Sequence, residues 1–226
     1  TTVQQQASPL PLPVLLPLKY VNFSKSRLNE ILGQNKKHLV IALLEDMISL
    51  LQKYPEIEIY LLTKKENLDI IPKELGVRFI FEDEKDLNRA LEKGVSFIKG
   101  KGEKVLILPL DLPFINEEDI KKLILIAKDE GGAISPSSRD GTSAMILPLD
   151  RKFKLQFGER SFQKHLSEFE KKKIPFQIHY SESLYYDLDT PEDVMRVLDI
   201  KKDSKAYSLL KDIASPDYNY DNLVDK

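Results

Sequence analysis

Continuous apolar runs alternate with amphipathic segments along most of this chain, and this alternation limits the folds that it can adopt. The runs do not alternate in polarity, which is typical of strands that are buried on both faces. They lie at residues 14–18, 57–63, 77–81, 105–110, 133–135, 144–147 and 176–180. Between most of them, apolar residues recur at helical spacing, in segments 36–53, 86–98, 116–129, 161–172 and 190–200. The order predicts a three-layer α/β fold in which helices cover both faces of a mainly parallel sheet.

The length and composition fit one domain of ordinary size. The chain has 226 residues, of which 42% are hydrophobic, and this is enough to bury one core. We expect a flexible leader at residues 1–13, which are polar and Pro-rich, and a globular domain at 14–200. Residues 201–226 are charged and then rich in Asp, Asn and Tyr, and are expected to form a peripheral C-terminal extension.

The charge balance and the residue types that are missing disfavour several classes of protein. The 34 basic and 36 acidic residues give a net charge of −2, so no overall field favours nucleic acid or a membrane surface. No apolar run reaches the roughly 18 residues of a membrane-spanning helix, and the start lacks the pattern of a secretion signal, so a cytoplasmic protein is expected. The absence of cysteine excludes disulfides and thiolate metal sites, and three histidines disfavour structural zinc.

A basic loop with Lys19, Lys25 and Arg27 follows the first apolar run. Ligands of parallel α/β sheets bind at the carboxyl ends of the strands, and several cations close together can neutralise a polyphosphate. A solvated basic loop before a helix is the alternative interpretation. The loop is not a P-loop, because the Gly-x4-Gly-Lys-Ser/Thr pattern is absent, and the dinucleotide-binding Gly-x-Gly-x-x-Gly pattern is absent as well.

Three acidic residues indicate a metal site. Asp111 follows the run at 105–110 and lies between two prolines, which favours a metal ligand over a turn-forming residue. Asp187 and Asp189 are two apart, so on an extended chain their carboxylates point to the same face and repel unless a cation intervenes. An exposed acidic loop is the alternative for this pair. Together with the basic loop, these carboxylates are what Mg²⁺ and a nucleoside triphosphate require.

Small and hydroxyl-bearing residues give a weaker signal for an anion site. Thr142 and Gly158 offer a hydroxyl and backbone N–H groups, and Ser161 begins a predicted helix, where an anion can bind. An ordinary turn and an ordinary N-cap explain the same residues, and for each residue alone this interpretation is favoured. His38 and His165 lie on predicted helices, and for both a packing or surface role is favoured over catalysis.

Six segments of the chain, in order, resemble the 2-phospho-L-lactate guanylyltransferase family, whose members activate a small phospho-acid in the synthesis of the deazaflavin coenzyme. They are LPLKYVNFSKSRL at 16–28, DLNRAL at 86–91, LILPLDLPFINEEDI at 106–120, RDGTSAMILP at 139–148, FGERSFQKHL at 157–166 and DLDTPEDV at 187–194. The resemblance implies a Rossmann-like fold of the nucleotide-diphospho-sugar-transferase type. It also implies that GTP is joined to 2-phospho-L-lactate, phosphoenolpyruvate or 3-phospho-D-glycerate, with Mg²⁺ as cofactor and release of pyrophosphate.

The resemblance implies roles for single residues as well. The family's metal-binding acids match Asp111, Asp187 and Asp189. The residues that hold the phospho-acid match Thr142, Gly158 and Ser161. The nucleotide-binding positions match Lys19, Lys25, Arg27 and Asn88. The catalytic positions are Lys25 and Arg27, which neutralise the leaving group, and Asp111.

The chain departs from the family's pattern at two positions. Tyr20 follows Lys19 where the family usually has Pro, and this affects the shape of the basic loop. Ser143 follows Thr142 where Asn is common, and this affects which acid is accepted. Residues 1–13 and those after about 200 have no recognised counterpart in the family.

Two other functions stay open at this point. A nucleotidyltransferase for a sugar phosphate or a molybdopterin would have the same fold, but such enzymes typically carry a Gly-rich first loop, and residues 14–27 contain no Gly. A non-catalytic nucleotide-binding protein could also use this fold, and the three retained acids argue against it. The expected partners are GTP and a small phospho-acid, without nucleic acid or membrane, and a homodimer is left open.

Overall fold

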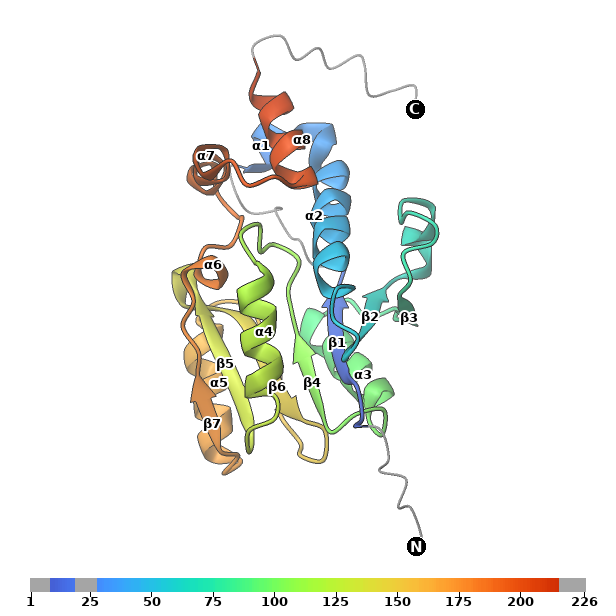
Figure 1. Cartoon of the computed structure of the whole chain (residues 1–226), viewed down its shortest axis with the longest axis vertical. Helices are drawn as coiled ribbons and strands as arrows, with labels where there is room; N and C mark the ends of the chain where they lie inside the picture. The colour runs from blue at the N-terminus through green and yellow to red at the C-terminus, as the bar shows by residue number, and fades with distance from the viewer. Residues whose placement is uncertain (1–8, 19–27, 216–226) are drawn as a thin grey trace, which may run out of the picture.

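The computed structural model describes residues 9–18 and 28–215 of the chain. The basic loop with Lys19, Lys25 and Arg27 lies outside the described residues, so its predicted role stays a prediction. The described part forms a single sheet with helices on both faces (Figure 1). None of its helices is both long enough and apolar enough to span a bilayer.

The sheet has seven strands within the described residues, in the order β3-β2-β1-β4-β6-β5-β7. Their bounds are β1 Leu12–Pro17, β2 Ile57–Thr63, β3 Arg78–Phe81, β4 Lys104–Ile107, β5 Gly132–Ser137, β6 Gly141–Pro148 and β7 Phe176–Ile178. All neighbouring strands pair in parallel except β6, which is antiparallel to both β4 and β5. The prediction of a mainly parallel sheet is therefore confirmed.

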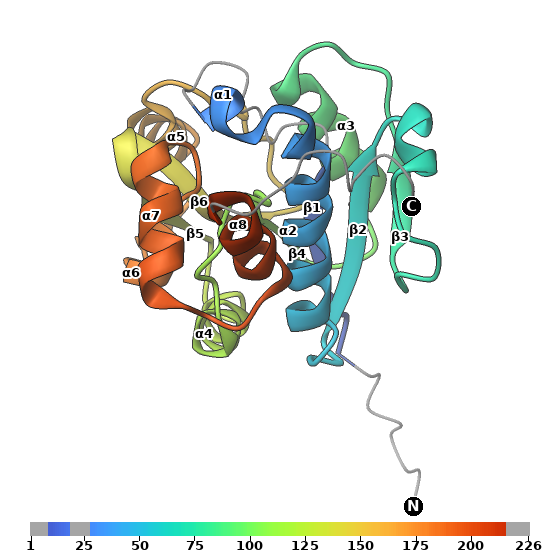
Figure 2. The same ribbon diagram turned by 90° about the horizontal axis from the view of Figure 1, so that it is seen from above.

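The helices cover both faces of the sheet and complete the three predicted layers. Their bounds are α1 Leu28–Leu32, α2 Lys36–Leu51, α3 Leu87–Ile98, α4 Glu117–Ile126, α5 Ser161–Lys171, α6 Glu182–Tyr185, α7 Pro191–Ile200 and α8 Lys205–Ala214. Seen from above, α3 and α5 lie on one side of the sheet and α4 lies on the other (Figure 2).

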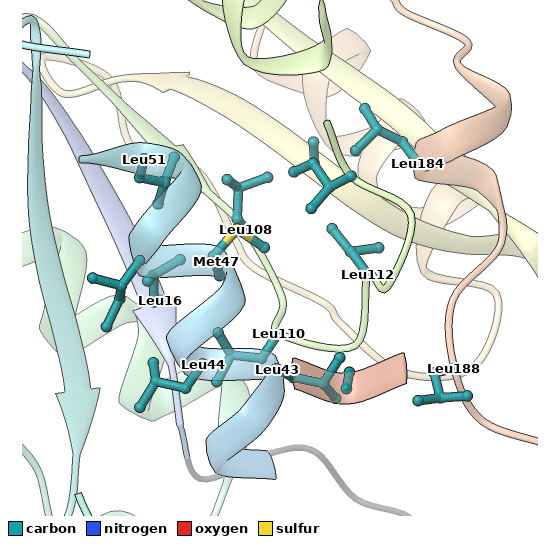
Figure 3. Packing of buried hydrophobic residues seen from close by; sticks show 14 of the residues in the cluster. Leu16, Leu43, Leu44, Met47, Leu51, Leu108, Leu110, Leu112, Leu184 and Leu188 are labelled. Carbon is teal, nitrogen blue, oxygen red and sulfur yellow. The ribbon is translucent and has the colours of Figure 1, made fainter. Parts of the chain in front are cut away.

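Two hydrophobic clusters, one on each face, explain why the strand segments are continuously apolar. In β1, Leu15 packs with the residues of α3 on one face, whereas Leu16 packs with the residues of α2 on the other. Figure 3 shows the cluster around Leu16, where Met47 of α2 lies near Leu108 of the segment after β4. Burying an apolar side chain of this size stabilises the fold by about 1.5–3 kcal/mol, so both faces of the strand hold the sheet in place.

Two expected domain boundaries differ from the structure. Strand β1 begins at Leu12, inside the expected leader, because Leu12 and the residues after it pair with β2. The expected extension after residue 200 contains α8, which packs against α2 and buries Ala206 and Leu210. Asp46 of α2 also accepts hydrogen bonds from the first backbone N–H groups of α8, at 2.9 and 3.0 Å. The fold therefore extends from residue 12 to residue 214.

Candidate active site

The edge of the sheet formed by the carboxyl ends of the parallel strands gathers the predicted site. Strands β1 and β4 lie side by side in register, with Leu15 opposite Ile107, so both end at this edge. The segment after β4 carries Asp111, and the segment 187–189 follows β7 by way of α6. Strand β6 runs in the opposite direction, so its first residues, Gly141 and Thr142, lie at the same edge.

The three predicted metal ligands are Asp111, Asp187 and Asp189, which we call the acidic rim. One backbone hydrogen bond links the segment that carries Asp111 to the segment that carries the other two. The Leu188 N–H donates to the Asp111 carbonyl oxygen at 2.8 Å. The Leu188 side chain is almost fully buried in the core (Figure 3). Of the two aspartates that flank it, the side chain of Asp187 is 18% exposed and that of Asp189 is 40% exposed. The backbone segments that carry Asp111 and Asp187–Asp189 therefore lie side by side at this edge.

Arg139 contacts both aspartates of the 187–189 segment. Its Nη2 lies 2.9 Å from Asp187 Oδ1 and 3.3 Å from Asp193 Oδ2, and its Nε lies 3.6 Å from Asp189 Oδ2. The single guanidinium therefore places Asp187 and Asp189 on one side of their segment, as their spacing predicts. Arg139 was not among the residues predicted from the sequence to form the site. Its signal was a basic residue in the RDGT segment, between a predicted strand and Thr142.

The start of α7 holds the other side of this ion-pair network. Thr190 and Asp193 form a capping box, with Pro191 in the first turn. Asp193 Oδ2 accepts from the backbone N–H of Asp189 at 2.9 Å and of Thr190 at 2.8 Å. Since Asp193 is nearly fully buried, the helix fixes the backbone that carries Asp189.

Within the described residues, the three carboxyl groups of the acidic rim share the positive charge of a single guanidinium, that of Arg139. Burial raises the pKa of Asp111 to about 7, and the neighbouring charges of Asp187 and Asp189 add to this rise. Burial also raises the pKa of Asp187, although hydrogen bonds from Ser138 and Arg139 act in the opposite direction. A cation near Asp111 would lower its pKa and favour the ionised form.

The donor chemistry of the acidic rim fits a hard divalent cation. Mg²⁺ prefers carboxylate oxygens and usually keeps several waters, so it needs only one or two protein carboxylates besides the substrate phosphates. In the described part of the chain, no group of three or more acidic or histidine side chains is arranged to enclose a metal as it stands. Asp187 instead points to Arg139 and Ser138, so the guanidinium supplies the positive charge in this structure.

A group of polar residues next to the acidic rim contains those predicted to bind the phospho-acid. The hydroxyls of Thr142 and Ser161, which we call the hydroxyl pair, lie 3.0 Å apart. Gly158 adopts φ of +122°, a conformation that only glycine adopts readily, and its carbonyl accepts from the Ser161 N–H at 3.2 Å. The structure therefore brings Thr142, Gly158 and Ser161 together, although they come from two elements and the loop between them.

Ser161 is not the N-cap of its helix. The N-cap position of α5 belongs to Arg160, which has a left-handed backbone and makes no capping hydrogen bond through its side chain. The Ser161 hydroxyl bonds to Thr142 instead of to a helix N–H. The interpretation of Ser161 as an ordinary N-cap is therefore wrong, and its hydroxyl belongs to the group around Thr142.

Asn88 anchors the loop that carries Gly158. Its side-chain amide donates to the Phe157 carbonyl at 3.1 Å, and its oxygen accepts from the Phe157 N–H at 2.7 Å. These two bonds hold α3 and the loop together across the face of the sheet. A contact between Asn88 and a nucleotide stays a prediction, because both polar groups of its side chain are engaged within the protein.

The residues 138–142 connect the acidic rim to the hydroxyl pair. Arg139 binds the acidic rim, and three residues later Thr142 binds Ser161. Asp140 lies 3.9 Å from Arg160, the residue before Ser161. The hydroxyl pair and the acidic rim thus lie at opposite ends of a five-residue stretch.

A sheet of this topology, with acids at the carboxyl edge and a pair of hydroxyls beside them, is that of a protein of the nucleotidyltransferase class. The fold agrees with a solved structure from Desulfovibrio desulfuricans that is provisionally named a nucleotide-diphospho-sugar transferase. It matches with a TM-score of 0.69 and 18% identity, over 88% of this chain and 93% of that chain. The predicted fold class is therefore confirmed.

The family is established by sequence. Residues 12–217 match the model of the family described as "Guanylyl transferase CofC like". The 2-phospho-L-lactate guanylyltransferase of Methanocaldococcus jannaschii is 30% identical over 202 residues, which are 88% of this chain and 88% of that protein. The phosphoenolpyruvate guanylyltransferase of Thermobaculum terrenum is 27% identical, over 83% of each chain. This chain belongs to the CofC-like guanylyl transferase family, and the predicted resemblance is confirmed.

The family match also corrects the expectation for the C-terminal region. Residues after about 200 were expected to have no counterpart in the family, but the match continues through α8 to residue 217. The packing of α8 on α2 gives a physical reason, because Ala206 and Leu210 complete the hydrophobic cluster on that face.

Proposed function

We propose that this chain joins the guanylyl group of GTP to a small phospho-acid and releases pyrophosphate. The acceptor is 2-phospho-L-lactate, phosphoenolpyruvate or 3-phospho-D-glycerate, and the product is a precursor of the deazaflavin coenzyme. The observation that carries the proposal is the stretch 138–142, which links the hydroxyl pair to the acidic rim. Two anionic substrates that must meet require two such sites side by side. We further propose that the enzyme works in the cytoplasm.

The proposed roles of the residues follow from their charges and positions. Thr142, Ser161 and the backbone at Gly158 would hold the phospho-acid through hydrogen bonds. Asp111, Asp187 and Asp189 would hold Mg²⁺, which supplies positive charge to the phosphate oxygens of both substrates when bound. Asp187 would have to leave Arg139 to take part.

The attacking group needs no general base, because a phosphate oxygen of the acid is already anionic. It attacks the α-phosphorus of GTP, the bond to the β-phosphate breaks, and pyrophosphate leaves. We propose that Lys19, Lys25 and Arg27 neutralise the triphosphate and the departing pyrophosphate. The described end of β1 supports this, because it brings the chain to the edge that carries Asp111. The protein thus contributes positioning and charge neutralisation.

We expect pyrophosphate release to require GTP, one of the three acids and Mg²⁺. The base preference follows from the family, and the metal requirement follows from the charge deficit of the acidic rim. The measurement is continuous pyrophosphate release with GTP or ATP, with each acid, and with Mg²⁺ or excess chelator. Equal rates with ATP and GTP would refute the proposed nucleotide, and full activity in chelator would refute the proposed cofactor.

A further inference from the structure

His165 is fully buried, and both of its ring nitrogens are bonded. Nε2 lies 2.9 Å from the backbone nitrogen of Gln156, and Nδ1 lies 3.0 Å from Thr142 Oγ1. The ring packs edge-on to Phe157, with the centroids 4.9 Å apart, and near Phe153 at 5.9 Å. These contacts hold the plane of the ring and confirm the packing role that the sequence favours for His165. They do not account for its bond to the hydroxyl pair.

The partner of Nε2 determines which tautomer His165 adopts. A backbone N–H can only donate, so Nε2 must be the unprotonated, accepting nitrogen. A neutral imidazole then carries its proton on Nδ1, and this N–H donates to Thr142 Oγ1. Burial, with a smaller effect of Lys164, lowers the pKa of His165 to about 4, which agrees with a neutral ring.

With this tautomer, the hydroxyl pair has one more O–H donor than there are acceptors within reach. Thr142 and Ser161 have two hydroxyl protons, and one of them is used in the bond between their oxygens. If His165 accepted at Nδ1, Thr142 could donate to it and Ser161 could donate to Thr142, and both protons would be used. Because His165 donates instead, one hydroxyl proton finds no acceptor within hydrogen-bond distance in the described part of the chain.

A buried donor without an acceptor costs free energy until a ligand supplies one. An anion is such a ligand, because phosphate and carboxylate oxygens only accept. Resting on the function proposed above, we infer that His165 is a positioning residue for the phospho-acid: its Nδ1–H orients the hydroxyl pair so that it donates to an anionic group of the acceptor. Asn88 supports this arrangement, since it fixes Phe157, the neighbour of Gln156.

Two amide substitutions separate the donor of His165 from its acceptor. The amide nitrogen of Asn can replace Nδ1, so His165→Asn keeps a donor to Thr142. The longer Gln can replace Nε2, so His165→Gln keeps an acceptor for Gln156 but loses the donor. Both variants lose the packing of the ring against Phe153 and Phe157, and therefore both should melt at lower temperature than the wild type.

We expect His165→Gln to weaken binding of the acid roughly 2- to 10-fold, the effect of losing the neutral hydrogen bond that orients Thr142, because the hydroxyl pair keeps its spare proton. His165→Asn keeps the donor to Thr142 and should bind the acid like the wild type. Ser161→Ala removes a hydroxyl that donates to the anion and should weaken binding roughly 10- to 150-fold. The KM of GTP should change little in all three. The measurements are the acid's KM and its calorimetric Kd for the three candidate acids, with the melting temperature as a control for folding.

A direct measurement of the tautomer keeps this inference separate from the proposed function. Nitrogen NMR of the three histidine rings, assigned with the His165 variants, should show His165 protonated at Nδ1 and not at Nε2 at neutral pH. A proton on Nε2, or equal effects of Asn and Gln on acid binding, would overturn the inference. A wild-type protein with this tautomer that neither binds nor turns over any of the acids would refute the proposed function and, with it, the role given to His165 in acid binding.

Discussion

Asp111→Asn is expected to lower the turnover of GTP by orders of magnitude while the metal-free protein stays as stable as the wild type or becomes more stable. The substitution keeps the size of the side chain and removes its charge. In the absence of a cation, the Asp111 carboxylate is disfavoured by burial and by Asp187 and Asp189. Removing the charge therefore relieves repulsion in the folded protein, although it removes a proposed ligand of Mg²⁺. Asp189→Asn should lower turnover in the same way.

Melting temperatures with and without Mg²⁺-GTP, measured beside turnover, test this expectation. The wild type should be stabilised by the ligands because they bind only the folded state, and the variants should gain much less. Asp83→Asn is a matched control, since Asp83 is exposed and pairs only with Lys93 among the described residues. A clear loss of metal-free stability in Asp111→Asn, with turnover kept in the protein that folds, would show a structural role instead.

The same variant has a signature in the pH dependence of stability. The pKa of Asp111 is about 7 in the folded protein, above the value of about 4 in an unfolded chain. Between these two values the folded state binds more protons, so the wild type should lose stability as the pH rises from about 4 to about 7. The raised pKa of Asp187 acts in the same direction. The loss should be smaller in Asp111→Asn.

Arg139→Gln is expected to have the opposite effect on the metal-free protein. Arg139 neutralises Asp187 and the buried Asp193, and its own side chain is 43% exposed. Removing one partner of a buried ion pair leaves an uncompensated charge. With an allowance for the exposure of the guanidinium, we expect a cost of about 1–3 kcal/mol, which corresponds to a fall in melting temperature of roughly 3–10 °C.

Mg²⁺ without nucleotide should restore part of the stability of Arg139→Gln and should change the wild type less. The reason is that Arg139 already supplies positive charge to the carboxylates in the wild type, whereas the variant leaves them to a metal. Arg78→Gln provides the control, because Arg78 pairs with Glu58 at the edge of the sheet and is largely exposed; such pairs contribute about 0–1 kcal/mol. If the melting temperature of Arg139→Gln equals that of the wild type and does not change with Mg²⁺, Arg139 does not take the place of a metal ion.

The pattern of apolar residues predicted most of the fold, because strands that are buried on both faces need continuous apolar runs. Strand β1 could be recognised from Val14–Leu18, but its first residues could not, since Pro11 and Pro13 resemble a loop. Helix α8 was missed because its surroundings are charged. The spacing of Ala206, Leu209, Leu210 and Ile213 is nevertheless that of an amphipathic helix.

The candidate site could be predicted only where residues close together in the sequence already indicate a chemistry. The acids stood out because two like charges on one face need a cation, and the structure places Arg139 between them. The role of His165 could not be predicted, because it depends on a backbone N–H nine residues away and a hydroxyl on another element. The anchor from Asn88 to Phe157 spans 69 residues, and no local pattern records such a contact.

The fate of the acceptor's oxygens tests the central claim most directly. The wild type would be incubated with GTP, Mg²⁺ and a phospho-acid whose phosphate group is labelled with ¹⁸O, and the products would be analysed by mass spectrometry. If a phosphate oxygen of the acid attacks the α-phosphorus, the guanylylated acid keeps all of the label and the pyrophosphate carries none. Label in pyrophosphate or orthophosphate, or GMP or GDP as the only nucleotide product, would contradict the proposed reaction.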